Sequence, residues 1–321
     1  MKNLLAACCG VLIALTANAA DKSYPTKPIR IIVPFAPGGP TDIVARTVGQ
    51  QLNVSLGQPV VIDNRPGAGG VVGADLAAKS APDGYTLLLC STGAMAINPG
   101  LMTKMPYDAL RDLAPITLVV TIPYLLLVNP SFPAQSVKDV LALARAKPGQ
   151  LNYGSAGTGT TSHLAMELFR SMANIQVTHI PYKGSALAAT DLVGGQLQLL
   201  FDAPPSSLPF VRSGKLRAIG ISTLKRTALL PDMPTINEAG VPGYEVLTWS
   251  GICAPSGTPR PVITQLNRAI VDGVTSRETR ERFVAIGADV VANSADECGR
   301  FIRAELTKWS RVIREAGVAA H

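Results

Sequence analysis

The sequence has few histidine and aromatic residues, and this scarcity limits the chemistry it can perform. Only three of its 321 residues are histidines, and one of these is the last residue, so general bases are few. Aromatic residues make up 5% of the chain and basic residues are spread along it, which argues against a nucleic-acid surface. An arginine-rich stretch over 300–314 carries glutamates at helical spacing, as a solvated helix face does. The sequence therefore predicts no catalytic residue and no nucleic-acid partner.

The five cysteines also exclude two kinds of site. Cys8 and Cys9 lie near the N-terminus, whereas Cys90, Cys253 and Cys298 are widely spaced through the rest of the chain. This spacing fits neither the usual zinc site nor a disulfide framework, so no metal is expected. Cys90 and Cys253 lie in apolar runs, where a buried thiol is the simplest interpretation, and a single disulfide remains an open alternative.

Two glycine-rich stretches begin like cofactor motifs but lack a residue that each motif requires. Residues 154–161 have the glycine spacing of a phosphate-binding loop, but Thr160 replaces its lysine. Residues 67–69 begin like a dinucleotide fingerprint, but Val72 stands where its third glycine belongs. No cofactor is therefore expected.

The N-terminal residues 1–19 have the pattern of a cleaved signal peptide. Lys2 supplies the positive charge, residues 4–15 form an apolar stretch too short to span a bilayer, and residues 17–19 give the cleavage site. Leu5 to Cys8 spells a lipobox, but cleavage there would leave almost no apolar stretch. We expect an exported protein without a transmembrane span.

The rest of the chain alternates apolar strands with amphipathic helices, which predicts an α/β fold. Most strands are continuous apolar runs, a pattern typical of parallel strands buried on both faces. The expected strands are 29–35, 60–63, 85–90, 116–121, 125–128, 151–154, 177–180, 197–201, 216–222 and 246–254. The expected helices are 42–56, 70–80, 137–146, 162–172, 186–193, 261–275 and 295–316.

One arrangement occurs twice: a strand, a glycine-rich loop with hydroxyl side chains, and the start of a helix. It reads IRIIVPFAPGGPTDIVAR over 29–46 and LNYGSAGTGTTSHLAMELF over 151–169, and the glycines that follow each copy have nearly the same spacing. This repetition predicts two lobes of similar topology, each a parallel-rich sheet flanked by helices, with two crossover hinge segments. We expect 20–122 plus 247–321 to form lobe 1 and 123–246 to form lobe 2.

Both loops are suited to binding an anion at a helix N-terminus. Glycines let a ligand approach the backbone amides, which we expect to be unpaired, and neighbouring serines and threonines add hydroxyl groups. Asp42 has two possible roles, as a helix cap or as a ligand contact, and Asp202 has the same two. Lys183 either adds a positive field at the same edge of the sheet or is simply solvated.

The chain resembles the Bug-type solute receptors, which are the extracytoplasmic binding proteins of tripartite tricarboxylate transporters. The resemblance rests on the 29–46 motif, VVIDNRPGAGGVVGADLAAKSAPDGYTLLL, PYKGSALAATDLVGGQLQLLFD and LPDMPTINEAGVPGYE, and it runs from Tyr24 to the C-terminus. It implies a type II periplasmic binding protein fold that holds a carboxylate between two opposed loops. The implied contacts are Phe35, Gly38, Gly39, Thr41 and Asp42 on one lobe, and Ser155, Ala156, Gly157, Thr158 and Gly159 on the other. Second-rank candidates for specificity are Thr92, His163, Lys183 and Asp202.

We therefore expect a monomeric, non-enzymatic periplasmic receptor for a small organic anion, either a mono- or dicarboxylate or an amino acid. Its expected partners are the membrane components of such a transporter. One alternative is a sensor that feeds a signalling receptor. Another is a secreted hydrolase that uses Ser155 or Ser162 with His163, although adjacent residues on a helix do not easily form a nucleophile–base pair.

Overall fold

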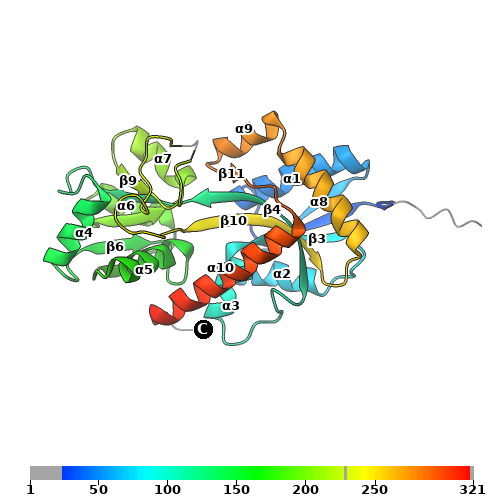
Figure 1. Ribbon diagram of the computed structural model, residues 1–321, viewed down its shortest axis with the longest axis horizontal. Helices are drawn as coiled ribbons and strands as arrows, with labels where there is room; N and C mark the ends of the chain where they lie inside the picture. Colours follow the sequence, from blue (N-terminus) through cyan, green and yellow to red (C-terminus); the bar gives the residue numbers. More distant parts are fainter. Residues whose placement is uncertain (1–23, 228–229, 319–321) are drawn as a thin grey trace, which may run out of the picture.

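The computed structural model describes residues 24–227 and 230–318, so the expected signal peptide at 1–19 lies outside the described residues. The described chain forms two separate mixed sheets, each flanked by helices, at opposite ends of an elongated molecule (Figure 1). This confirms the expected α/β architecture. Across the described ranges, no helix combines the length and the apolar character needed to cross a membrane.

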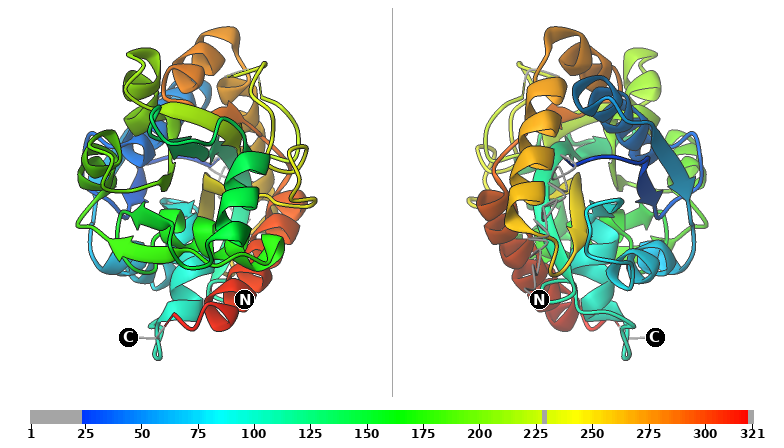
Figure 2. Two further views of the ribbon diagram at one scale, coloured as in Figure 1. Left: turned by 90° about the vertical axis from the view of Figure 1, so that its left-hand side faces the viewer. Right: turned by 90° about the vertical axis from the view of Figure 1, so that its right-hand side faces the viewer.

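The first sheet has six strands in the order β11-β4-β10-β3-β1-β2. Alternate residues of β1 face opposite layers: Ile31 belongs to the hydrophobic cluster of α1 and α8, whereas Ile32 belongs to the cluster that includes α2. The strands are therefore buried on both faces, as their continuous apolar sequences predict. Helices α1 and α8 lie side by side on one face (Figures 1 and 2). The strands are β1 (Ile29–Val33), β2 (Val60–Asn64), β3 (Thr86–Ser91), β4 (Leu113–Pro123), β10 (Leu247–Pro255) and β11 (Asp289–Val290), and the helical elements are α1 (Pro40–Leu56), η1 (Ala68–Gly70), α2 (Val71–Ala78), η2 (Gly93–Ile97), α3 (Asn98–Leu101), α8 (Arg260–Val274), α9 (Arg277–Ala285) and α10 (Ala295–Glu315).

The second sheet has five strands in the order β7-β6-β8-β5-β9. Leu125 and Leu127 pack under α6, whereas Leu126 and Phe201 pack on the opposite face with α4 and α5. The strands are β5 (Leu125–Val128), β6 (Asn152–Ser155), β7 (Thr178–Pro181), β8 (Leu199–Asp202) and β9 (Arg217–Ile221), and the helices are α4 (Val137–Ala146), α5 (Thr161–Ala173), α6 (Ser185–Val193) and α7 (Pro204–Arg212).

Strand direction differs from the expectation at the strands that connect the two sheets. Parallel pairing is confined to β2-β1-β3 and β7-β6-β8. Strands β10 and β5 pair antiparallel with both of their neighbours, and β11 pairs antiparallel with β4. Two of these, β5 and β10, enter their sheets directly from the other lobe rather than through a helical crossover. Apolar composition shows that a strand is buried, but it does not show the direction in which the strand runs.

The two connections between the sheets meet at one buried residue, Ser222. Its amide donates to the carbonyl of Tyr124, and its hydroxyl accepts from the Tyr124 amide at 2.7 Å. The same hydroxyl donates to the carbonyl of Val246, whose own amide donates to the Ser222 carbonyl. Tyr124 follows β4 and Val246 precedes β10, so Ser222 joins the outgoing and returning chains.

Helix α10 also links the lobes, because it packs against β4, η2 and α3 of the first lobe and against α5 of the second (Figure 1). It begins with a capping box formed by Ser294 and Glu297. Farther along it, buried Glu305 accepts from the indole N–H groups of Trp249 at 3.1 Å and Trp309 at 3.0 Å. Lys308 forms an ion pair with the same carboxylate. One hydrophobic cluster therefore extends through both lobes along this helix.

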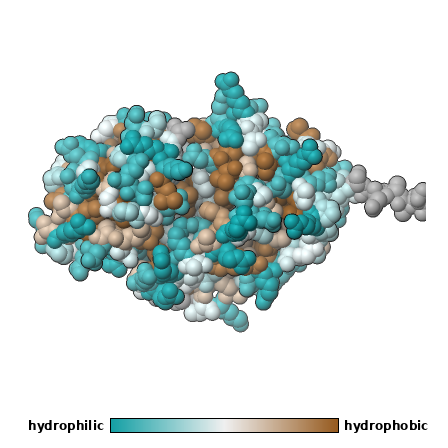
Figure 3. Space-filling view, in the orientation of Figure 1, coloured by the Kyte–Doolittle hydropathy of each residue, from teal (hydrophilic) through white to brown (hydrophobic). Residues whose placement is uncertain are grey.

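All ten expected strands and seven expected helices are present, and the elements that were not expected are short, among them the nine-residue helix α9, whose sequence is mostly charged. Strand β11 has two residues, and η2 and α3 form a short irregular segment, so their periodicity is too brief to recognise. Helix α7 starts with two prolines and contains Pro209, which masks its pattern. Cys90, Cys253 and Cys298 are all buried free thiols. In the view of Figure 3, hydrophilic residues are interspersed with hydrophobic patches, several of which lie near the middle of the molecule.

Candidate functional site

A cavity of about 800 Å³ lies between the lobes. It is found beyond the carboxyl ends of β1, β3, β6 and β8, which is where open α/β sheets bind ligands. Both lobes contribute to its wall, and the first turns of α1 and α5 approach it from opposite sides. The lining residues are Phe35, Pro40, Thr41, Gly69, Ser91, Thr92, Gly93, Ile97, Asn98, Leu101, Ile122, Tyr124, Thr158, Gly159, Thr160, Thr161, Ala203, Pro205, Ser206, Thr248, Trp249 and Ser250.

Asp42 holds the first glycine loop in shape. Its carboxylate accepts from the Gly38 amide at 2.9 Å, from Asn64 Nδ2 at 2.9 Å and from Arg46 Nε at 2.8 Å. Burial alone would raise the pKa of Asp42, but these hydrogen bonds outweigh burial and hold the pKa below its usual value. Gly38 has a φ of +87°, which favours glycine at this turn. Asp42 is thus fully engaged within its own lobe.

The second glycine loop satisfies several of its own amides. The Ala156 amide donates to Ser162 Oγ at 2.9 Å, the Gly157 amide to Ser155 Oγ at 3.1 Å, and the Gly159 amide to His163 Nδ1 at 3.1 Å. The expectation of unpaired amides throughout both loops is therefore wrong at these three positions and at Gly38. The reason is local, because polar side chains two to six residues away along the chain bond back to the loop.

Unpaired amides remain directly after each loop, in the first turns of helices α1 and α5. The amides of Thr41 and Asp42 in α1, and those of Thr161, Ser162 and His163 in α5, have no hydrogen-bond partner among residues 24–227 and 230–318. Thr41 and Thr161 line the cavity. The positive ends of two helix dipoles from different lobes therefore reach the same space.

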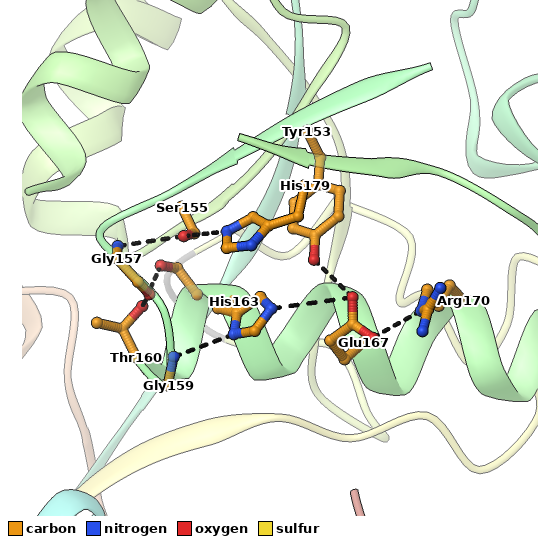
Figure 4. A network of polar contacts seen from close by, with 10 residues as sticks. Tyr153, Ser155, Gly157, Gly159, Thr160, His163, Glu167, Arg170 and His179 are labelled. Atoms are coloured by element: carbon orange, nitrogen blue, oxygen red, sulfur yellow. Dashed lines mark hydrogen bonds and ion pairs between the residues drawn. The ribbon is translucent and has the colours of Figure 1, made fainter. Parts of the chain in front are cut away.

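A network of aromatic and charged side chains supports the second loop from behind (Figure 4). The His163 and His179 rings stack with centroids 4.0 Å apart, and His179 Nε2 lies 2.7 Å from Ser155 Oγ. Tyr153 donates to Glu167 Oε1 at 2.6 Å, and Arg170 donates to the other oxygen at 2.6 Å. Burial lowers the pKa of both histidines to about 4, with a further contribution from Arg170 for His163 and from His163 for His179. Both rings are neutral near pH 7.

The structure brings five of the fourteen predicted site residues into the cavity wall and places the others around it. Phe35, Thr41, Thr92, Thr158 and Gly159 line the cavity. Lys183 is exposed and lies outside the lining. Asp202 is buried behind Ser206, which donates to it at 2.6 Å, and burial raises the pKa of this carboxyl group. The residues that shape the two loops without lining the cavity are Gly38, Gly39, Asp42, Ser155, Ala156, Gly157 and His163.

Several lining residues were not predicted. Tyr124 lies between β4 and β5, Trp249 lies near the start of β10, and Ser91 and Ser250 are directly opposite each other on β3 and β10. The Ser91 side chain is buried, and its hydroxyl has no hydrogen-bond partner in the described part of the chain. Trp249 is one of only two tryptophans in the sequence, and this rarity was the one feature that could have marked it as a candidate site residue.

Ser155 contacts His179, but its hydroxyl group is not accessible as a nucleophile. Ser155 is 0% exposed, and its oxygen already accepts from the Gly157 amide. Ser155, His163 and His179 all lie outside the cavity lining. This arrangement stabilises the loop and leaves no room for a substrate at the hydroxyl.

Comparison with known proteins identifies the family. A family model described as the tripartite tricarboxylate transporter family receptor matches residues 44–318. The chain is 41% identical over 317 residues to protein BugT of Bordetella pertussis, and the match covers 98% of this chain and 97% of BugT. A solved R. palustris structure described with adipate is 38% identical, has a TM-score of 0.78, and matches 92% of this chain and 99% of its own. MatC from Rhodopseudomonas palustris with bound malate is 33% identical, has a TM-score of 0.73, and matches 90% of this chain and 100% of its own. The resemblance to Bug-type receptors is therefore confirmed, and the chain belongs to the tripartite tricarboxylate transporter receptor family, whose members are periplasmic binding proteins.

Proposed function

We propose that this protein captures a small organic anion between its two lobes and delivers it to the membrane components of a tripartite tricarboxylate-type transporter. The observation that carries the proposal is the pair of helix N-termini, from α1 and α5, that line one cavity from opposite lobes. An anion placed there gains from both helix dipoles at once, which a single lobe cannot provide.

The ligand class follows from the site and from the relatives together. Two solved relatives are described with adipate and with malate, and both of these ligands are carboxylates. Free amides and hydroxyl groups in the wall of this cavity are suitable donors to carboxylate oxygens. We propose Phe35, Thr41, Thr92, Thr158 and Gly159 as ligand contacts, supported by the loop residues behind them.

The lobes are proposed to be 20–122 plus 247–321 and 123–246, with the hinge where the two connecting segments meet at Ser222. Contact across the cleft supports closure around the ligand: a Cβ atom on Gly287 of the first lobe would lie 2.9 Å from Pro204 Cβ of the second. Closure would then present a new surface to the membrane partner. We propose that one copy of the chain suffices for capture, because the two helix N-termini that approach the cavity from opposite sides, those of α1 and α5, belong to the same chain.

We also propose that the protein is exported to the periplasm and that it acts as a receptor rather than as an enzyme. Residues 1–19 are proposed to be removed, which leaves the mature receptor in the periplasm, as for other family members. Mass spectrometry of the exported protein would give the mature N-terminus. The inaccessible Ser155 supports a receptor rather than a hydrolase.

A thermal-shift screen of the mature protein against carboxylates and amino acids tests this function. A ligand at about 100 times its Kd should stabilise the folded state by roughly 2.7 kcal/mol. The Thr158→Asp variant should lose the shift because it places a like charge in the wall, whereas Ser213→Asp on the exposed end of α7 should keep it. The function is contradicted if no acid raises the melting temperature, or if turnover of an ester or amide appears.

A further inference from the structure

Helix α10 carries a row of arginines along the outside of the molecule (Figures 1 and 2). Arg300, Arg303, Arg311 and Arg314 are all exposed, and their spacing places them on one side of the helix. The sequence predicts a solvated helix face here because glutamates share the stretch. However, Glu305 in its middle is buried and accepts from two indole N–H groups, so it does not balance the exposed arginines.

Most of this positive charge has no counter-ion on the protein. Among the ion pairs that α10 forms with the rest of the described chain, none involves Arg300, Arg303 or Arg314. Arg311 reaches Glu315 only at 4.0 Å, and both side chains are exposed. Like charges three residues apart on a helix repel each other and lower its stability. The folding of α10 therefore does not explain the arginine row.

The arginine row borders a groove on the surface of the first lobe, which we call the α10 groove. One part, of about 680 Å³, lies between the start of α8 and the first turns of α10, and a second part, of about 590 Å³, continues along α10. Arg300 and Arg303 line both parts. Small and apolar residues such as Pro115, Ile263 and Ala304 lie between the charges. The charged lining residues are five cations and one carboxylate, namely Arg260, Arg300, Arg303, Lys308, Arg311 and Asp296.

The shape and chemistry of the α10 groove favour a protein segment over a flat membrane surface. A guanidinium group binds a carboxylate through two parallel N–H···O bonds, and arginine is enriched in protein interfaces. The stems of the arginines and the apolar residues between them offer contacts to the side chains of a bound segment. A bilayer is flat on this scale, so it would reach only the tips of the exposed arginines.

The α10 groove lies outside the ligand cavity but close to the junction of the lobes. It shares no lining residue with the cavity between the lobes. Helix α10 packs against α5 of the second lobe, and Lys308 Nζ donates to the carbonyl of Glu245 in the returning connection at 3.5 Å. A partner bound along α10 would therefore sit beside the hinge and leave the ligand site uncovered.

We propose that the α10 groove is the docking surface for an acidic segment of the membrane components of the transporter. This inference rests on the proposed function and adds to it the place of contact and the charge of the partner. Arg300 and Arg303, at the centre of the groove, pair with aspartate and glutamate side chains of that segment. Attraction between opposite charges also speeds association, because it acts before the surfaces touch.

Charge reversal tests this docking surface in the full mature protein. The groove variant is Arg300→Glu/Arg303→Glu. The matched control is Arg212→Glu/Lys215→Glu, which makes the same change in charge at two exposed residues of the second lobe outside the groove. Both variants should keep the thermal shift with a bound acid, because none of the four residues lines the ligand cavity. Surface plasmon resonance against the purified membrane components, held in nanodiscs of zwitterionic phosphatidylcholine, measures docking.

We expect the groove variant to dock about tenfold or more weakly, mainly through a slower association rate, and the control to dock like the unmodified protein. Docking of the unmodified protein should also weaken as the salt concentration rises, and that of the groove variant should depend less on salt. Equal docking by the two variants would overturn the inference and leave the proposed function intact.

Vesicles of anionic phosphatidylglycerol without protein separate a lipid partner from a protein partner. If the groove variant loses binding to these vesicles but docks normally on the membrane components, the arginines bind lipid and the inference is wrong. If the unmodified protein binds a carboxylate but docks on no membrane component, the proposed delivery to the transporter itself fails.

Discussion

Gly159 and Leu101 meet across the cleft: a Cβ atom on Gly159 would lie 2.7 Å from Leu101 Cδ1. Leu101 ends α3 in the first lobe, and Gly159 belongs to the glycine loop of the second. Because Gly159 has no side chain, the end of the Leu101 side chain can pack directly on the backbone of the loop. An added methyl group at Gly159 would have to displace the end of the Leu101 side chain at this edge of the cleft.

Gly159→Ala is therefore expected to weaken ligand binding about tenfold or more, because the added methyl group opposes closure against Leu101. The control is Gly149→Ala in the same lobe. Gly149 has a φ of +74°, close to the +77° of Gly159, but its Cβ atom would meet nothing within 4 Å. Both variants should lose similar stability from backbone strain, and only the first should lose affinity by calorimetry. Equal affinities would contradict a closing contact at this position.

Ser222→Ala is expected to reduce the free energy of unfolding by about 1–3 kcal/mol, since the change leaves the buried Tyr124 amide without its acceptor. Urea denaturation would measure the loss. Ser213→Ala, which removes one exposed hydrogen bond, should change stability by less than about 0.5 kcal/mol. Similar effects of both substitutions would show that the hinge bonds add nothing to stability.

Glu305→Ala is expected to be strongly destabilising, by about 3 kcal/mol or more, because it leaves two indole N–H groups and Lys308 without their acceptor in a buried site. Thermal unfolding followed by fluorescence suits this test, since Trp249 and Trp309 are the only tryptophans of the chain. The exposed Glu315 on the same helix provides the control substitution to Ala, which should be nearly neutral. An equal loss in both variants would contradict the role of Glu305.

Stability is expected to fall as the pH decreases from about 6.5 to about 4, because of His163 and His179. Burial lowers the folded-state pKa of both to about 4, whereas the unfolded value is near 6.5. The unfolded state therefore binds more protons in this window, and acid favours unfolding. The double variant His163→Gln/His179→Asn should show a flatter dependence of melting temperature on pH than the unmodified protein. Parallel pH profiles would contradict buried, neutral histidines.

The sequence predicted the elements of this fold well because burial and glycine geometry leave local signals. Helix α4 has the predicted ends, and its apolar residues recur at helical spacing. Gly38, Gly157 and Gly159 adopt positive φ values, which is why glycines mark both loops. The direction of β10 left no such signal, because pairing with β3 and β4 depends on residues more than a hundred positions away.

The site was predicted less completely than the fold, because part of it depends on contacts between residues that are distant in the sequence. Phe35 and Thr158 lie in recognisable loops, whereas Ser91 is the last residue of β3 and has no glycine motif beside it in the strand. The hydrogen bond from the Gly159 amide to His163 was also not predicted. The sequence shows that a helix begins here, but it does not show whether the amides before the helix are already hydrogen-bonded. Loop motifs indicated where a ligand binds but not which amides remain free.

The charge-free wall of the cavity has a consequence for the surroundings in which the protein acts. Peptide dipoles and serine or threonine hydroxyl groups do not gain or lose protons over the range in which carboxylic acids and histidines do. The side chains of the wall therefore keep their charge when the medium outside the cell becomes acidic or alkaline, although the Gly159 amide loses its acceptor once His163 Nδ1 takes up a proton near pH 4. Above the pH at which His163 and His179 take up protons, ligand capture is therefore expected to follow the ionisation of the acid: acidification lowers the concentration of its carboxylate form, while the side chains of the cavity wall keep their charge.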